Sequence, residues 1–339
     1  MNDSAQQRSP RFRIWCEHLA YEDARKAEVL DLLCTGPIHP IFAVLHEADL
    51  DELAALLRAV QARGLGAGIW PLLPEALGYW PSERNAAAYF ERIQELLSQL
   101  EARECAPQWI AVDLEPPIDQ VSLLLRSSFG LPAAVVQLFL ANMDPARFAD
   151  SSAIFCREIG ALNARGFETL GVTLPLAAHD LRDGGTLWQD LLEAPWAAVP
   201  WNHAGIMAYG SMIAGYSRGM LSVEDARAIH FRLFEHLVAA FGERAHASLG
   251  VTGTGKLGDE PVYTSAEELA QDVAAARAAG ISDIAIFCLE GLIGRPDAGR
   301  WIELAMGAEP KAAPQTRRYG VVRQGGSFLR RALLALAKS

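Results

Sequence analysis

Two carboxylic acids at the end of an apolar run are the residues of this chain best suited to chemistry. Residues 108–117 read QWIAVDLEPP, so Asp113 and Glu115 stand two positions apart and two prolines follow at once. Residues i and i+2 of a strand point to the same face, which puts these Cα atoms roughly 6–7 Å apart. Two carboxyls this close on an apolar wall cannot both ionise freely, so the pKa of one should rise. A protonated carboxyl beside an ionised one suits general acid catalysis at neutral pH, although acids here could also simply end a strand.

Eight short apolar runs predict the strands that would position these acids. Their continuous apolarity, without alternation, is typical of parallel strands that are buried on both faces. Between them, capped segments with helical periodicity predict helices at Asp49–Arg63, Asn85–Glu104, Ser222–Phe241 and Ser265–Ala279. The predicted strands are Phe12–Cys16, Ile41–Leu45, Gly66–Leu72, Trp109–Leu114, Thr169–Leu174, Ala204–Tyr209, Ala247–Val251 and Asp283–Leu289.

This alternation predicts an α/β fold, a (β/α)8 TIM barrel that spans residues 11–308. A doubly wound sheet is the competing architecture, but no GxGxxG pattern follows the first strand. Residues 116–165, after the fourth strand, exceed an ordinary connection and predict a helical insertion, with helices at Leu131–Asn142 and Pro145–Arg165. The insertion could be a lid over the site or a plain structural addition.

Residues 309–339 are predicted to form a basic tail outside the barrel. One interpretation is a peripheral contact with an anionic membrane or with a protein partner. The other, which we favour because the helix is short, is docking on the barrel's own surface. The segment Ser327–Ser339 predicts an amphipathic helix whose apolar stripe is Phe328, Leu329, Ala332, Leu333 and Leu336.

The charge balance argues against a nucleic-acid partner. The net charge is −11, and the last 29 residues carry seven basic residues and no acids, so the rest of the chain carries −18. Residues 1–13 are polar and lack the apolar core of a signal peptide, and no apolar run has the length of a transmembrane helix. Five scattered cysteines without CxxC spacing suit a reducing compartment and give no zinc site. We therefore expect a cytoplasmic protein without a bound metal or other cofactor.

Polar and aromatic side chains recur where the predicted strands end, at the face where barrel enzymes carry their active sites. Aromatic faces stack on sugar rings, and carboxylates and histidines bind sugar hydroxyls, so this mixture predicts a carbohydrate substrate. The candidate catalytic residues are Asp113, Glu115 and Tyr209. The candidate substrate-binding residues are Glu17, His46, Trp70, His179, Asp180, Met207, Phe287 and Glu290.

Four strand ends resemble those of glycoside hydrolase family 18, the chitinase and endo-N-acetylglucosaminidase barrels. The fourth strand of that family carries D-x-x-D-x-D-x-E, at whose four defined positions this chain has Gln108, Ala111, Asp113 and Glu115. The sixth-strand M-x-Y of the family is matched by Met207-Ala208-Tyr209. The seventh and eighth strands, which end in leucine-glycine and near W-x-L-E-G, are similar to Leu249-Gly250-Val251-Thr252-Gly253 and Phe287-Cys288-Leu289-Glu290-Gly291. The resemblance covers Arg13 to Trp301.

The resemblance implies hydrolysis of a glycan that contains N-acetylhexosamine, with assistance from the substrate. Glu115 would protonate the glycosidic oxygen, and the substrate's own 2-acetamido oxygen would attack the anomeric carbon. Asp113 would orient and stabilise that acetamido group, and Tyr209 would donate a hydrogen bond to it. Phe287 would form the floor beneath the sugar.

Three positions depart from the pattern of the family. Ala111 stands where the family has its inner aspartate, Gly210 where it commonly has aspartate, and Phe287 where it has tryptophan. The first two departures favour an alternative, a non-catalytic barrel that binds a glycan or a protein. A third interpretation is a divalent-metal-dependent enzyme similar to sugar isomerases, although no HxH or HExxH spacing supports it. Its ligands would come from Glu17, His46, Glu47, Glu115, His179, Asp180 and Glu290.

Overall fold

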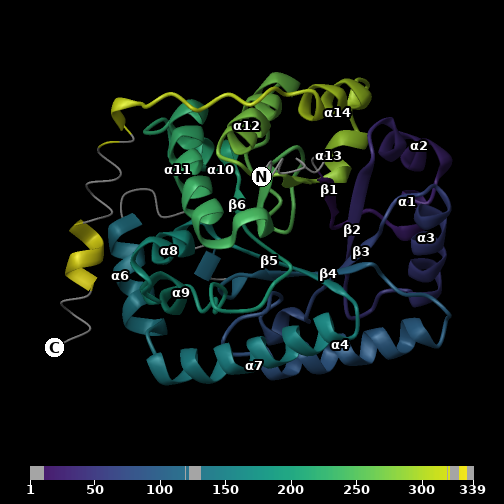
Figure 1. The fold of residues 1–339 in the computed structure, drawn as a ribbon, viewed down its shortest axis with the longest axis horizontal. Helices are drawn as coiled ribbons and strands as arrows, with labels where there is room; N and C mark the ends of the chain where they lie inside the picture. The colour runs from purple at the N-terminus through teal and green to yellow at the C-terminus, as the bar shows by residue number, and fades with distance from the viewer. Residues whose placement is uncertain (1–10, 119, 122–130, 319, 321–327, 334–339) are drawn as a thin grey trace, which may run out of the picture.

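A computed structural model describes residues 11–118, 120–121, 131–318, 320 and 328–333. Eight parallel strands pair in sequence order and close into a barrel, with helices around it (Figure 1). The predicted TIM barrel is therefore confirmed. The strands are β1 (Arg11–Cys16), β2 (Ile38–Val44), β3 (Gly68–Pro71), β4 (Trp109–Leu114), β5 (Glu168–Thr173), β6 (His203–Ala208), β7 (Ala245–Gly250) and β8 (Asp283–Phe287).

The helices begin at the capping residues that the sequence offers. Asp49 and Ser265 cap α3 and α12, and Ser222 forms a capping box with Asp225 at the start of α11. The helices are α1 (Tyr21–Ala24), α2 (Ala27–Thr35), α3 (Leu50–Ala62), α4 (Ala86–Glu101), α6 (Leu131–Asn142), α7 (Pro145–Ala164), α8 (His179–Asp183), α9 (Leu187–Leu191), α10 (Gly210–Tyr216), α11 (Val223–Phe241), α12 (Ala266–Ala278), α13 (Leu289–Ile293) and α14 (Ala298–Met306). Short 3-10 turns are η1 (Glu75–Leu77), η2 (Pro175–Ala178) and η3 (Gly242–Arg244).

The stretch after β4 contains both predicted helices. The long helix α7 lies beside α4 on the outside of the barrel, and the rings of Phe90 and Phe155 pack edge to face with centroids 5.1 Å apart (Figure 1). It is thus the crossover helix that leads from β4 to β5. The helix α6 packs against α9, and its Val135 lines a cavity at the barrel's C-terminal face.

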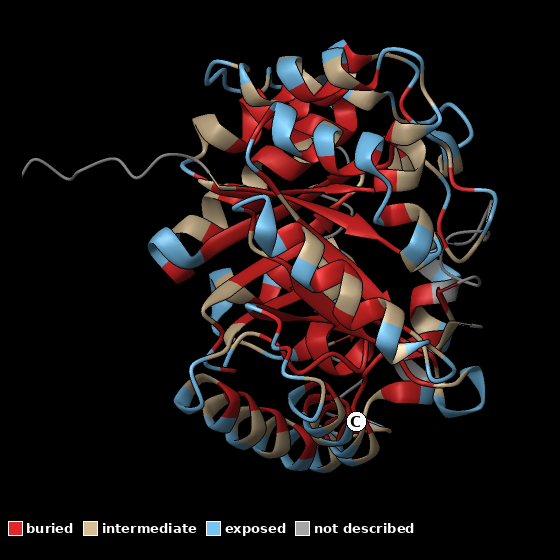
Figure 2. Cartoon of the chain, turned by 90° about the vertical axis from the view of Figure 1, so that its right-hand side faces the viewer, coloured by how far each residue is buried: buried red, intermediate tan, exposed pale blue. Residues whose placement is uncertain are grey.

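Two apolar layers give the barrel its stability. Buried faces of the outer helices cover the strands, while their other faces meet solvent (Figure 2). Inside the barrel, tryptophan side chains fill the space, and Trp15 and Trp70 pack edge to face at 5.1 Å. Ala111 and Trp109 are buried in this same apolar interior. The interior of the barrel is therefore a packed core.

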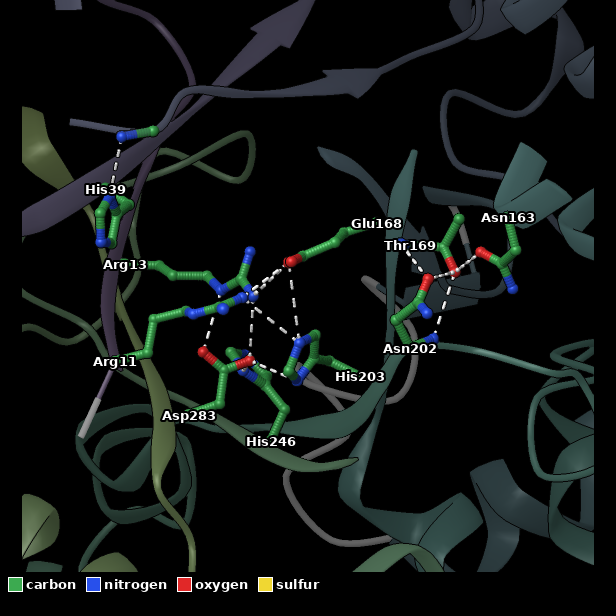
Figure 3. Close-up of polar contacts among 11 residues, drawn as sticks. Arg11, Arg13, His39, Asn163, Glu168, Thr169, Asn202, His203, His246 and Asp283 are labelled. Atoms are coloured by element: carbon green, nitrogen blue, oxygen red, sulfur yellow. Dashed lines mark hydrogen bonds and ion pairs between the residues drawn. The ribbon is translucent and has the colours of Figure 1, made fainter. Parts of the chain in front are cut away.

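An ionic cluster closes the opposite end of the barrel, where the strands begin (Figure 3). The guanidinium of Arg13 donates to both carboxylate oxygens of Asp283, at 3.0 and 3.2 Å, and both side chains are buried. His203 and His246 each place a ring nitrogen within 3.2 Å of the same carboxylate. Although burial opposes ionisation, Arg13 and His246 hold the pKa of Asp283 well below its usual range.

Ser248, His246 and Asp283 contact one another in the order of a serine–histidine–aspartate catalytic triad. They lie in the barrel core, however, and not at a site open to substrate. The Ser248 hydroxyl lies 3.0 Å from Nε2 of His246, whose Nδ1 faces Asp283. All three side chains are buried, and Trp15 donates a hydrogen bond to the Ser248 hydroxyl at 3.1 Å. A substrate cannot reach a serine in this position, so we assign the three residues to the packing of the barrel.

The described part of the tail docks on the barrel. Lys311 donates its backbone N–H to the carbonyl of Ala274, and Arg318 donates to the carbonyl of Met220. In residues 328–333, which are helical, Leu333 is fully buried and Leu329 packs on the core. The rest of the predicted helix Ser327–Ser339, including Leu336, lies outside the described residues. Within the described ranges, no helix is both long and apolar enough to cross a membrane.

We expect Asp283→Asn to lower the free energy of unfolding by about 3–5 kcal/mol, because it removes the nearer and fully buried counter-charge of Arg13 and leaves only Glu168 at 3.8 Å. Urea denaturation would measure the change. Glu101→Gln is the matched control, since Glu101 also pairs with an arginine, Arg165, but lies outside the cluster and its side chain is 58% exposed. The control should cost about 1 kcal/mol at most. Equal losses in the two variants would contradict the assignment of the cluster's stability to Asp283.

Candidate active site

The strand β4 delivers both acids to the floor of a cavity of about 1300 Å3 at the C-terminal face of the barrel. Asp113 is 5% exposed and Glu115 is 7% exposed, and both side chains line this cavity. Burial is the main cause that raises the pKa of each carboxyl above its usual range. The expectation that one pKa rises therefore holds for both members of the pair.

The two carboxyls are coupled. Burial is the largest cause that raises the pKa of Glu115, and the negative charge of Asp113 raises it further. The pair therefore titrates as a unit, in which the two carboxyls can share one proton.

A third carboxylate, Glu17, reaches the cavity from the end of β1. The hydroxyl of Tyr79 donates to its Oε1 at 2.9 Å, and Nε2 of His18 lies 3.5 Å from its Oε2. Burial raises the pKa of Glu17, and His18 and the Tyr79 hydrogen bond oppose that shift. The charge of Glu17 in turn raises the pKa of both Asp113 and Glu115.

Aromatic side chains border the acids. The rings of Tyr209 and Phe287, from the ends of β6 and β8, lie 5.5 Å apart and tilted by 36°. Burial, with Asp113 and Glu115 nearby, raises the pKa of Tyr209 well above its usual value. The Tyr209 hydroxyl therefore keeps its proton and can donate a hydrogen bond inside the cavity. Trp70 lines the same cavity from the end of β3.

Most of the predicted site residues meet in this one cavity. Three do not line it: His46, Asp180 and Glu290. His46 is exposed in the loop after β2. Asp180 is buried, and its Oδ2 accepts the backbone N–H groups of Trp188 and Gln189, each at 2.9 Å, at the start of α9. The residues that line the cavity are Glu17, Trp70, Asp113, Glu115, His179, Met207, Tyr209 and Phe287.

Glu290 joins two loops at the rim. Its Oε1 accepts the backbone N–H groups of Glu17, His18 and Leu19, at 2.6, 2.6 and 3.1 Å. The carboxylate therefore fixes the loop after β1 to the end of β8. Glu290 acts as a positioning residue for Glu17, whereas the sequence predicted a contact with substrate.

Several residues that line the cavity are not among the predicted site residues, and most of them lie in loops. Tyr79 packs edge to face against Trp80, with ring centroids 5.1 Å apart, and the Lys256 ammonium lies 4.6 Å from the Tyr79 ring centroid. The adjacent aromatics Tyr79 and Trp80, next to a proline, were the only signal in the sequence. The missed lining residues include Trp80, Trp188, Lys256 and Glu260.

Two glycines of the seventh- and eighth-strand motifs are explained by close approach of backbone. A Cβ atom on Gly291 would lie 2.2 Å from the backbone nitrogen of Gly253. Side chains are therefore excluded where the loops after β7 and β8 cross. These parts of the resemblance describe architecture, and they carry no information on the reaction.

Gly210 has a comparable reason. A Cβ atom there would lie 2.9 Å from Oδ2 of Asp272, a buried residue of α12. Arg227 donates to the other oxygen of Asp272 at 2.5 Å, and the Tyr263 hydroxyl donates to Oδ2. The space that an aspartate at position 210 would need is thus taken by another carboxylate.

The candidate metal ligands are dispersed. Of the seven, only Glu17, Glu115 and His179 line the cavity, and Asp180 and Glu290 are engaged by backbone N–H groups. Within the described part of the chain, no three His, Cys, Asp or Glu residues converge in an arrangement that could hold a metal ion.

Known proteins resemble this chain in fold. No protein-family model matches the sequence, and no curated protein matches it. The glycoside hydrolase domain of PgaB (BpsB) from Bordetella bronchiseptica matches with a TM-score of 0.52 at 13% identity, over 90% of this chain and 100% of that domain. A chitinase from Chromobacterium violaceum matches with a TM-score of 0.51 at 11% identity, over 88% and 99% of the two chains. The spore cortex-lytic enzyme SleL of Bacillus megaterium matches with a TM-score of 0.52 at 11% identity, over 92% and 77%.

These structural neighbours are glycoside hydrolase and chitinase barrels. At such low identity the similarity shows the fold alone.

Gly210→Ala tests the close approach of α12 to the end of β6. The added methyl group would meet the Asp272 carboxylate, so we expect the free energy of unfolding to fall by about 1–3 kcal/mol. Gly160→Ala in α7 is the control, because a Cβ atom there meets nothing within 4 Å. That substitution should be neutral or stabilise by about 0.4–1 kcal/mol. A Gly210→Ala variant as stable as the control would refute the crowding.

Proposed function

We propose that this protein is a glycoside hydrolase that acts on a glycan containing N-acetylhexosamine, with Glu115 as the general acid. The observation that carries the proposal is the buried pair Asp113 and Glu115 on the floor of the large cavity. Burial raises the pKa of Glu115, the residue that the family resemblance assigns as the acid, and so favours its protonated form. The glycoside hydrolase folds of the structural neighbours support the same reaction class.

The proposed reaction is the one that the family resemblance implies, and it gives a role to each of three side chains. Glu115 transfers its proton to the glycosidic oxygen as the bond to the anomeric carbon breaks. The 2-acetamido oxygen of the substrate forms a bond to that carbon, while Asp113 accepts a hydrogen bond from the acetamido N–H and Tyr209 donates one to its oxygen. Water then attacks the anomeric carbon and displaces the acetamido oxygen, whose bond to that carbon breaks, and Glu115 takes a proton from the water, which restores the enzyme.

The walls of the cavity suit a sugar ring at the acids. Phe287 and Trp70 offer aromatic faces, and the Tyr209 hydroxyl and Glu17 offer polar groups at the same place. A non-catalytic barrel that binds a glycan would share these walls, but it would have no need for a protonated acid buried beside its ionised partner.

The first test is Glu115→Gln, assayed with aryl β-N-acetylhexosaminides and short chito-oligosaccharides. Glutamine preserves the shape of the side chain but has no proton to give, so we expect kcat to fall by at least about 100-fold, in line with the usual contribution of a general acid. EDTA should leave the activity of the unmodified protein unchanged. Binding of these sugars without turnover would favour the non-catalytic barrel, and activity that EDTA abolishes would favour the metal-dependent enzyme.

The pH dependence of kcat/KM gives an independent test. The reaction needs Glu115 protonated, and its pKa is raised by burial and by the charges of Asp113 and Glu17. Activity should therefore fall on the alkaline side at a pH well above the usual range for glutamic acid. Glu17→Gln removes one of those charges, lowers the pKa of Glu115 and should move the alkaline limb to lower pH. Glu47→Gln, at an exposed position, is the control and should leave the limb in place. If the alkaline limb of kcat/KM stays at the same pH in the Glu17→Gln variant, that result would argue against Glu115 as the titrating acid.

A further inference from the structure

The cavity continues beyond the acids into a region that the proposed reaction does not use. Its volume of about 1300 Å3 exceeds the roughly 300–1,000 Å3 of typical small-molecule sites. Away from the carboxyls, the walls come from η2, α10, α11 and the described C-terminal segment, and η2 and α10 each pack against α11 (Figure 1). We call this region the apolar arm and define it by Leu176, Met212, Ile213, Ile229, Leu233 and Leu329.

The side chains of the apolar arm do not suit additional sugar rings. Each sugar ring carries several hydroxyls, and each hydroxyl that leaves water for an apolar wall loses hydrogen bonds that the wall cannot replace. Leucine, isoleucine and methionine offer no such bonds. A hydrocarbon chain loses nothing there and gains from leaving water.

Two arginines beside the arm are paired with carboxylates. Arg330 lies 3.3 Å from Asp183, and Arg232 lies 2.7 Å from Glu235. A charged group on a ligand would have to compete with these partners. A ligand group that lies along the six apolar side chains gains most when it is itself neutral and apolar.

The outer end of the cavity carries two large apolar side chains that face solvent. Met220 is 65% exposed and Phe328 is 71% exposed, and both line the cavity. Arg318 binds the carbonyl of Met220 at 2.9 Å and so holds the tail at this place. An apolar ligand that extends from the arm would cover both side chains.

We infer that the substrate is an amphiphilic glycoside, whose sugar binds at the acid pair and whose neutral alkyl aglycone lies along the apolar arm. The inference rests on the proposed function, because it names the group that leaves when Glu115 protonates the glycosidic oxygen. The carboxyls and the arm belong to one continuous cavity, so a single molecule can occupy both.

The test measures binding of the methyl, butyl and octyl β-glycosides of N-acetylglucosamine to the Glu115→Gln protein, by titration calorimetry below the critical micelle concentrations. Each buried methylene can improve affinity by up to about fourfold. We expect the octyl glycoside to bind at least about tenfold more tightly than the butyl glycoside. Adding Ile213→Asn on α10 or Leu329→Asn in the tail should abolish this gain. Ala214→Asn is the matched control, because it lies on the same helix but does not line the cavity, and it should keep the gain.

Turnover of the same glycosides by the unmodified protein separates the two proposals. If the protein hydrolyses these glycosides but binds them with an affinity independent of chain length, the inference of an amphiphilic substrate is overturned. The proposed hydrolase function is then still supported. A gain with chain length that survives both Ile213→Asn and Leu329→Asn also overturns it. A third outcome is a gain in affinity with chain length that Ile213→Asn and Leu329→Asn abolish, in a protein that does not hydrolyse the glycosides. It would support the apolar arm as a binding site for amphiphiles and would overturn the proposed hydrolase.

Discussion

The joint burial of Asp113 and Glu115 is the constraint on which the site depends. Two ionised carboxylates side by side in an apolar surrounding would repel each other and lose their hydration, so the pair must bind a proton. The tryptophan-filled interior beneath them and the aromatic rings of Tyr209 and Phe287 create that surrounding. The same burial that costs stability therefore supplies a protonated acid at a pH where a solvated glutamate is ionised.

Much of the remaining structure at the rim holds this pair and its neighbours in place. Glu290 ties the loop after β1 to the end of β8 through three backbone N–H groups. The crossing of Gly253 and Gly291 brings the loops after β7 and β8 into contact. Catalytic geometry in a barrel is assembled from several strands, so contacts between loops matter as much as the acids themselves.

The sequence predicted the barrel well because its strands are continuous apolar runs, and the strand Trp109–Leu114 was predicted to the residue. β2 begins at Ile38, three residues before its predicted start, because His39 and Pro40 interrupt the apolar pattern while the pairing with β1 continues. Within the site, the alternation of a strand placed the two acids together. Asp180 was predicted after the correct strand, but the direction of its side chain could not be predicted, because residues beyond a strand do not follow the strand's alternation. The side chain accepts backbone N–H groups at the start of α9. Tyr79 was missed because only the fold brings its loop to Glu17.

The departures from the family 18 pattern follow from the same packing. Ala111 lies within the apolar interior, so β4 places no carboxylate beneath Asp113. A third negative charge nevertheless acts on the pair, because Glu17 enters from β1 and raises the pKa of both acids. Charge that the motif lacks at position 111 is thus restored from another strand. In the proposed reaction, Glu17 thus helps to keep the acid protonated, as general acid catalysis requires.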